Sequence, residues 1–238
     1  MSEQVAVERI EPGSAAWWAA HAERLRRRRP RSGGFTVETI VDAALRIVDA
    51  EGADALTVRR LASSLGTSSA SLYRHVGSVD ELLVLLVDRA LGEVDQPADD
   101  LDPRDRVVAL ATELRRVLLA HPGVVPALRA APLGGPNAAQ GVESGLRDLL
   151  AMGFPPEVAV PGCLALIDYV LGSVFFDSAS AGERARTPDE SGPSTLEAIG
   201  VDESSLTSDE VFRAGVETFL DGLARRARPP LTHASGDR

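Results

Sequence analysis

The first half of the chain carries a series of short apolar patterns at helical spacing. Apolar residues recur at i, i+3, i+4 and i+7 over residues 37–48, which predicts an amphipathic helix that begins after Thr36 and ends at Gly52. Thr57 can cap a second, shorter helix, and Gly66 supplies the positive-φ residue that ends it. The pattern therefore predicts a long helix followed by a short one.

The third predicted helix, about residues 69–75, has too few apolar residues for a core helix. It buries little more than Leu72 and Val76, which lie four residues apart on one side. Its other sides must therefore face something polar. Ser78 and Glu81 then form a capping box that opens a fourth helix with a long apolar stripe.

The rest of the chain is again helical, after a break rich in acidic residues and proline at residues 95–103. Helices are predicted over residues 104–120, 124–131, 137–152 and about 155–176, followed by a loop over 177–208 and a last amphipathic helix. Aromatic residues are only 4% of the chain, while Ala, Leu and Val dominate, which favours helices over a β-sandwich. The predicted fold class is all-α.

The net charge of -10 taken alone argues against binding to nucleic acid, because a polyanion repels another polyanion. The distribution of charge changes that interpretation. Within the acidic middle of the chain, residues 55–79 contain no acid and include Arg59, Arg60, Arg74 and His75. This acid-free window contains the third predicted helix.

Two short helices joined by a tight turn that contains Gly are typical of a helix-turn-helix, whose second helix enters the major groove of DNA. Ala62 lets the two helices approach, Gly66 permits the turn, and Leu72 fills the gap between them. The side chains left outside can donate to and accept from phosphates and base edges: Thr67, Ser68, Ser69, Ser71, Tyr73, Arg74 and His75. The alternative is that short Ser-rich helices simply lie solvated at the surface.

Residues 35–91 resemble the DNA-binding region of the tetracycline-repressor (TetR) family of bacterial transcriptional regulators. The resemblance rests on the segments EG, LTVRRLA, LG, SLYRHV and DELL, in this order and at the family's separations. Farther on, HPGVVPALR and MGFPPEVA are similar to the tetracycline-repressor-type C-terminal domain. The expected organisation is a basic, partly disordered extension (1–34), a three-helix helix-turn-helix DNA-binding domain (35–94), an effector-binding and dimerisation bundle (102–228) and a disordered tail (229–238).

The resemblance also implies roles for individual residues. Thr57 and Arg59 correspond to residues at the start of the second helix that contact the DNA backbone and, for the Arg, sometimes a guanine. The recognition surface corresponds to Ser69, Ala70, Ser71, Tyr73, Arg74 and His75. Within this surface Tyr73 and His75 are expected to hold phosphates, and Ser69, Ser71 and Arg74 are expected to read bases. Many family members carry a Lys where this chain has Val79, so one phosphate contact is missing or replaced by backbone amides of the fourth helix.

Six Arg and one Glu occupy residues 21–31, just before the first predicted helix. We expect an arm whose Arg28, Arg29 and Arg31 run along the DNA backbone or enter the minor groove. The alternatives are a solvated disordered tail and, because Trp17 and Trp18 are adjacent, a basic amphipathic membrane helix.

The C-terminal helices are expected to supply a dimer interface and an effector site. The residues assigned to the dimer interface are Leu164, Leu171, Phe175, Phe212, Val216, Phe219 and Leu223. The candidates for the effector site are Leu118, Met152, Cys163, Asp168, Tyr169 and Phe176. Asp168 stands in an apolar run, where a buried carboxylate needs a partner or a ligand; the alternative is a residue that faces solvent or another subunit.

The main hypothesis is a homodimeric, cytoplasmic repressor that a small organic effector releases from palindromic operator DNA. No Ser/His/Asp order, phosphate loop or metal-ligand spacing supports an enzyme, a cofactor or a metal site. No run approaches 18 apolar residues, so a membrane span is not expected. The alternative hypothesis is a helical ligand-binding or scaffold protein with weak or lost DNA affinity, which Val79 and the acidic net charge support.

Overall fold

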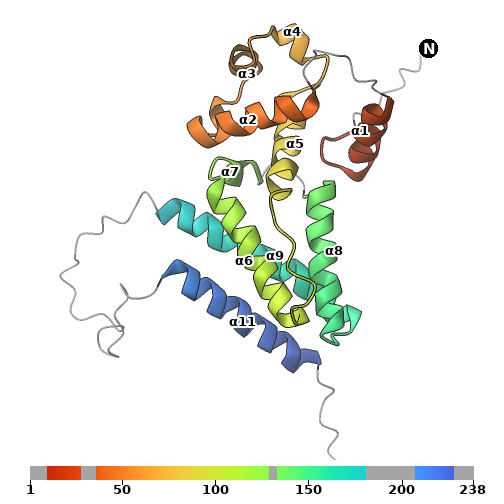
Figure 1. Ribbon diagram of the computed structural model, residues 1–238, viewed down its shortest axis with the longest axis vertical. Coiled ribbons are helices and arrows are strands. Elements are labelled where there is room, and N and C mark those ends of the chain that lie inside the picture. The colour runs from red at the N-terminus through yellow and green to blue at the C-terminus, as the bar shows by residue number, and fades with distance from the viewer. Residues whose placement is uncertain (1–9, 28–35, 129–132, 181–206, 228–238) are drawn as a thin grey trace, which may run out of the picture. The chain divides into compact units, whose positions relative to one another are not determined.

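The computed structural model describes residues 10–27, 36–128, 133–180 and 207–227, and every regular element within them is helical (Figure 1). These elements belong to two compact units, residues 1–95 with 116–141 (unit 1) and residues 96–115 with 142–238 (unit 2). Helices α6 (Pro103–Ala120) and α8 (Pro136–Ala151) contribute residues to both units. The all-α fold class predicted from the sequence is confirmed.

Unit 1 is built from short helices whose starts are set by side-chain caps. In chain order they are α1 (Ala15–Arg27), α2 (Val37–Glu51), the 3₁₀ turn η1 (Ala53–Ala55), α3 (Val58–Ser64), α4 (Ser69–Leu72), α5 (Val79–Leu91) and α7 (Val124–Leu128). The predicted caps are present, since the hydroxyl oxygens of Thr36, Thr57 and Ser78 accept from the backbone N–H three residues later at 3.2, 3.1 and 3.1 Å.

Helix α2 is the centre of the core of unit 1, where it packs against α3, α5 and α7. Ile40, Ala44 and Val48 lie on its buried stripe and are fully excluded from solvent. The turn between α6 and α7 approaches α2 so closely that a Cβ atom on Gly123 would lie 2.1 Å from the carbonyl oxygen of Val48. Glycine at this position therefore allows α7 to pack directly on α2.

Helices α3 and α4 meet in the predicted tight turn. Gly66 has a φ angle of 61°, and the N–H of Thr67 donates to the carbonyl oxygen of Ala62 at 2.9 Å, which closes the end of α3. Helix α4 ends at Leu72, and residues 73–75 continue as a turn, so it is shorter than the predicted helix over 69–75. A segment that buries only Leu72 and Val76 has little packing to stabilise further helical turns.

Unit 2 contains α9 (Pro156–Ser180) and α11 (Ser208–Ala227), which pack against each other and against parts of α6 and α8. The core that joins them includes Val107, Leu149, Val170 and Val216. Part of the loop predicted over 177–208 is helical, because α9 continues to Ser180 and α11 begins at Ser208. The remainder of that loop, residues 181–206, lies outside the described residues.

Helix α9 is long and apolar enough over Pro156–Asp177 to cross a membrane, by length and composition, with a mean hydropathy of 1.9. The sequence pattern did not indicate this, because Asp168 and small polar residues interrupt the apolar run. Buried helices of globular proteins share this composition, and α9 packs along α11 through the core of unit 2. Its apolar character is therefore explained in part by that core.

Candidate nucleic-acid interface

The recognition surface lies on α4 and the turn that follows it. Tyr73 is 56% exposed and Arg74 is exposed, while His75 is half-buried. Leu72 and Val76 lie beneath them and are 3% and 7% exposed. The apolar residues of this short segment therefore fasten it to unit 1, and its polar side chains point outward.

Two serines hold α4 and the side chain of Arg74 in place through hydrogen bonds. The hydroxyl oxygen of Ser68 accepts from the N–H of Ser71 at 3.2 Å and caps the helix. The Ser71 hydroxyl in turn accepts from Nη2 of Arg74 at 3.1 Å. Ser69 is half-buried and Ala70 is exposed, so both lie on the same outward segment. The guanidinium group of Arg74 is thus steadied by a residue that we also expect to face bases.

The start of α3 adds two exposed residues, Thr57 and Arg59. The oxygen of Thr57 caps α3, which leaves its hydroxyl hydrogen available for donation. The neighbouring Arg60 instead donates from Nε to Glu51 at 3.1 Å, and this hydrogen bond holds the pKa of the Glu51 carboxyl below its usual value. Arg59 and Arg60 are both exposed at this end of α3, and the resemblance to the family assigns the expected DNA contact to Arg59.

The N-terminus of α5 follows the recognition surface and is capped from two sides. The Ser78 hydroxyl accepts from the N–H of Glu81 at 3.1 Å, as predicted. The Glu81 carboxylate, however, accepts from the N–H of Gly77 at 3.0 Å, one residue earlier than a capping box requires. It also accepts from the indole N–H of Trp17 at 3.3 Å. Val79, half-buried in this turn, supplies no cation.

The predicted arginine arm falls outside the described residues, because Arg28, Arg29 and Arg31 follow the end of α1. Within the N-terminal extension, however, residues 15–27 form α1, which the sequence did not predict because it lacks an apolar stripe. Its alanines favour a helix, and its buried residues are Trp17 and His21. Trp17 is 3% exposed, so it is not available to a lipid surface.

A chain of charged side chains links α2, α5 and the end of α6 within unit 1. Arg89 on α5 donates to Asp42 on α2 and to Glu93, each at 2.9 Å. His121, at the end of α6, places Nε2 3.0 Å from Glu93 and Nδ1 2.7 Å from Asp49 on α2. Burial opposes the protonation of His121, but the two carboxylates outweigh it and raise the pKa of His121 above its usual value.

Asp88 on α5 forms a second buried link within unit 1. It is 7% exposed, and its Oδ1 accepts from the N–H groups of Asn137 and Ala138 at 3.1 and 3.2 Å. Because these are among the first N–H groups of α8, Asp88 caps that helix from a neighbouring one. Burial raises the pKa of Asp88, and the backbone hydrogen bonds oppose this shift.

The effector candidates occupy different environments. Leu118 is fully buried and belongs to unit 1. Met152, Cys163 and Tyr169 all pack on the core of unit 2, and burial raises the pKa of the Cys163 thiol. The two remaining candidates, Asp168 and Phe176, are exposed. Asp168 therefore fits the alternative of a residue that faces solvent or another subunit.

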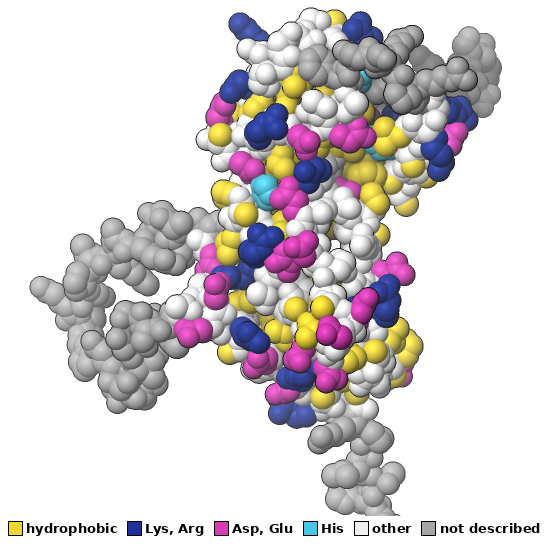
Figure 2. Space-filling model, in the orientation of Figure 1, with side chains coloured by type: hydrophobic (Ala, Val, Ile, Leu, Met, Phe, Trp, Pro, Cys, Tyr) yellow, Lys and Arg dark blue, Asp and Glu magenta, His cyan; other side chains and the backbone are white. Residues whose placement is uncertain are grey.

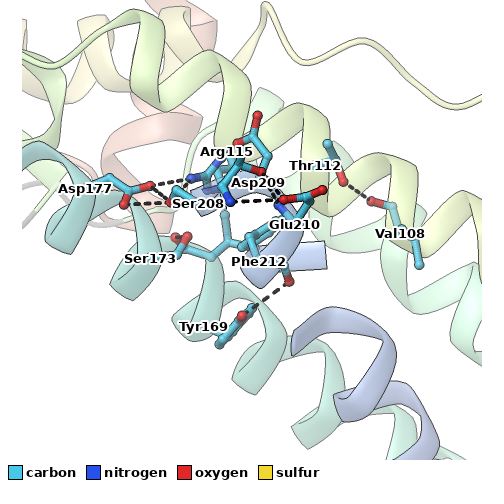
Figure 3. A network of polar contacts seen from close by, with 12 residues as sticks. Val108, Thr112, Arg115, Tyr169, Ser173, Asp177, Ser208, Asp209, Glu210 and Phe212 are labelled. Atoms are coloured by element: carbon cyan, nitrogen blue, oxygen red, sulfur yellow. Dashed lines mark hydrogen bonds and ion pairs between the residues drawn. The ribbon is translucent and has the colours of Figure 1, made fainter. Parts of the chain in front are cut away.

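Arg115 on α6 is the centre of a polar network in unit 2 that the sequence analysis missed (Figure 3). It is 5% exposed and forms ion pairs with Asp177 on α9 and Asp209 on α11. Its guanidinium group also donates to the Ser208 hydroxyl at 2.8 Å and lies 5.0 Å from the ring centroid of Phe212. A signal was present, because Arg115 occupies a position of the apolar stripe of α6.

The residues expected at the dimer interface divide by exposure. Phe212, Val216 and Leu223 belong to the core of unit 2 itself, while Leu171 and Phe219 are half-buried. Leu164 and Phe175 on α9 are 53% and 45% exposed. Other large apolar side chains that are exposed on the same two helices are Val160, Phe176 and Val211. An apolar face of α9 and α11 is thus left uncovered.

The charge distribution differs along the molecule. Figure 2 shows acidic and basic side chains interspersed over the visible face of unit 2. In unit 1, the acid-free window over residues 55–79 coincides with α3, α4 and their turn. Among the described residues no group of three or more His, Cys, Asp or Glu is placed to hold a metal ion.

Two family models match the chain. The model for bacterial regulatory proteins of the tetR family matches residues 40–86, and the model for the tetracyclin repressor-like C-terminal domain matches residues 96–227. The first covers α3, α4 and most of α2 and α5, and the second covers the helices from α6 to α11.

Curated relatives and solved structures agree with these models. An HTH-type transcriptional regulator of Saccharopolyspora erythraea is 38% identical over 60% of this chain, which spans only 61% of that regulator. The HTH-type transcriptional repressor DrrR1 of Streptomyces coeruleorubidus is 36% identical over 88% of this chain and 73% of the repressor. The crystal structure of the Streptomyces coelicolor TetR family protein ActR in complex with actinorhodin gives a TM-score of 0.70 at 34% identity, over 83% of this chain and 100% of ActR.

Proposed function

The chain belongs to the tetracycline-repressor (TetR) family of bacterial regulators, and from this premise we propose that it is a homodimeric transcriptional repressor. In this proposal it acts in the cytoplasm, binds a palindromic operator and leaves it when a small organic effector binds. The observation that carries the proposal is the recognition surface of α4, polar and outward-facing above the buried Leu72 and Val76.

We assign the DNA contacts by side-chain chemistry. Tyr73 and His75 hold phosphates, which fixes α4 in the groove without reading sequence. Arg74, with Ser69 and Ser71 beside it, reads base edges, because a guanidinium fork matches the two acceptors of guanine. Thr57, Arg59 and Ala70 complete the surface, with Thr57 and Arg59 on the backbone.

The dimer forms in this proposal through α9 and α11. Leu164 and Phe175 supply exposed apolar area on α9, with Leu171 and Phe219 half-buried beside them. Phe212, Val216 and Leu223 support this face from the core beneath. A face of this kind is buried when two copies meet, which agrees with the symmetry of a palindromic operator.

The effector site is placed in unit 2, near the core on which Met152, Cys163 and Tyr169 pack. ActR, which is similar to this chain over 83% of its length, has been solved in complex with actinorhodin. This complex supports an organic effector for this chain. The chain offers no residue pattern for turnover of such a ligand, so we propose binding without catalysis.

Selection of bound duplexes from random DNA, using the full chain, tests the proposed function. We expect enrichment of a palindrome whose half-sites lie about 34–36 Å, or a multiple of this, apart. Compounds are then screened for release of that operator. If a folded chain enriches no sequence at low salt, the alternative of a helical ligand-binding or scaffold protein with weak or lost DNA affinity replaces the proposal.

A further inference from the structure

Helix α1 is fixed to the helix-turn-helix by a buried tryptophan. Trp17 is 3% exposed, and its indole N–H donates to one carboxylate oxygen of Glu81 at 3.3 Å. The other oxygen of Glu81 accepts from the N–H of Gly77 at 3.0 Å. Since Gly77 comes two residues after His75, α1 is attached to the turn that directly follows the recognition surface.

A second contact holds the beginning of α1 within unit 1. A Cβ atom on Gly134 would lie 2.8 Å from the carbonyl oxygen of Gly13 and 3.7 Å from the ring of Trp18. His21 stacks on Trp17 with ring centroids 5.0 Å apart. Helix α1 therefore packs as an ordered part of unit 1, beside α5 (Figure 1), with a defined inner face.

The exposed side of α1 is basic. The side chains of Arg26 and Arg27 are 71% and 78% exposed, and both donate to Glu23, at 2.8 and 2.6 Å. Exposed ion pairs of this kind within one helix are weak, because water already solvates both charges. Phosphate groups can therefore replace Glu23 as the partner of these two guanidinium groups.

The position of this basic side favours DNA over a lipid surface. The first turn of α5 carries Val79, Asp80 and Glu81, so it offers no cation to the duplex. A helix that binds at a membrane surface inserts its aromatic face into lipid, whereas the face of α1 that contains Trp17 is buried against α5.

We propose that α1 is an accessory DNA-binding element whose Arg26 and Arg27 hold backbone phosphates beside the site that α4 contacts. The inference rests on the proposed function, since it requires that α4 binds a duplex. Phosphate contacts carry no sequence information, so α1 adds affinity and salt dependence and leaves base preference unchanged.

The test measures affinity against salt for the full chain on its selected operator. In the double variant Arg26→Ala with Arg27→Ala, the slope of log K against log salt should become shallower by about 0.9 for each phosphate that is no longer neutralised, or up to about 3.6 for a dimer. Affinity should fall by the same factor for operator and for unrelated duplex of equal length. Glu23→Gln, which removes the competing carboxylate, should tighten binding to both.

A charge-matched control is Arg225→Ala with Arg226→Ala, at the exposed end of α11. It removes the same net charge and should leave the slope unchanged. A slope equally reduced in this control would mean that net charge alone acts, and would overturn the inference.

The outcomes separate the inference from the proposed function. If selection enriches an operator but the Arg26 and Arg27 variant keeps the parent slope, α1 does not contact DNA and the proposed function stands. If the parent enriches no operator, the proposed function is wrong, and so is the proposed DNA contact of α1. If the double variant keeps its slope but loses sedimentation with phosphatidylserine vesicles, the basic side serves a membrane instead.

Discussion

Tyr73 and Arg74 are neighbours on the recognition surface, yet we propose different contributions to DNA binding for them because their side chains differ in chemistry. A tyrosine hydroxyl can bond to any phosphate, whereas a guanidinium fork pairs with the two acceptors of a guanine. The hydrogen bond from Arg74 to Ser71 restricts the fork before DNA arrives. The side chain of Arg74 therefore loses less conformational entropy when it binds DNA than an unrestrained arginine would.

Replacing Arg74 by Ala should relax the preference at one base position, at a cost of about 1–3 kcal/mol for the preferred base. Tyr73→Phe should instead weaken binding to every sequence alike, because it removes only the hydroxyl. Competition assays with operators changed one base pair at a time measure both effects. An intact base preference in Arg74→Ala would show that Arg74 does not read the operator.

We expect the contacts of His121 to make the stability of unit 1 depend on pH. Its carboxylate partners, Asp49 and Glu93, raise its folded pKa above the unfolded value of about 6.5, and Arg89 and Asp42 are the other charged groups of the chain of contacts. The stabilisation is complete below the unfolded pKa and is lost as the pH rises through the folded pKa.

The variant His121→Ala should therefore unfold with a free energy about 1.5–3 kcal/mol lower than the parent at pH 6, the range for hydrogen bonds to charged groups. The difference should narrow as the pH rises from 6 toward the folded pKa of His121, where the parent loses the extra proton. Chemical denaturation at a series of pH values checks this. A difference that is the same from pH 6 to pH 8 would contradict a protonated His121.

At the scale of helices, the sequence predicts what local chemistry determines. The caps at Thr36, Thr57 and Ser78 and the turn at Gly66 depend on residues close in the chain, and they were predicted in their places. The links between helices were not predicted. Arg115 meets partners 62 and 94 residues away, and no local pattern pairs them.

Helix α1 was also not predicted, because its packing depends on a residue far away in the sequence. Trp17 is the one large apolar residue of α1 that is fully buried, and its hydrogen-bond partner, Glu81, lies 64 residues later. An amphipathic stripe was therefore absent, and the basic composition alone indicated an extended arm. Similarly, the shortage of apolar residues in the α4 segment predicted an exposed polar surface, and Tyr73 and Arg74 are exposed. The six effector candidates and the DNA contacts of individual residues stay predictions, and the effector site is the harder to predict because apolar residues of α6, α8 and α9 are core residues for any function.

The capping of α8 by Asp88 allows a prediction at the scale of one helix. Asp88→Ala should lower the free energy of unfolding by about 0.5–2 kcal/mol, the usual range for the loss of an N-cap. Asp88→Asn keeps the oxygen that accepts from Asn137 and Ala138, so it should lose less. Denaturant titration of both variants makes the comparison, and equal losses would mean that the charge, not the cap, is important.

At the scale of the whole molecule, the exposed apolar face of α9 should determine the oligomeric state. Leu164→Glu with Phe175→Glu removes two apolar side chains, each contributing about 1.5–3 kcal/mol on burial, so the dimer Kd should rise about a hundredfold or more. Leu150→Glu, on the 42% exposed Leu150 of α8, is the matched control. Sedimentation equilibrium distinguishes them, and a double variant that stays dimeric would place the interface elsewhere.

The contacts of Arg115 hold α9 and α11 together independently of the peptide chain that joins the two helices. They join the last turns of α9 to the first turn of α11, so a second bridge, made of ion pairs, runs in parallel with the peptide chain between Ser180 and Thr207. A chain cut at an engineered protease site in that interval should therefore run as two fragments under denaturing conditions and as one particle under native ones. With Arg115→Ala, the two fragments should separate at a lower concentration of denaturant, because the core of α9 and α11 alone then holds them together.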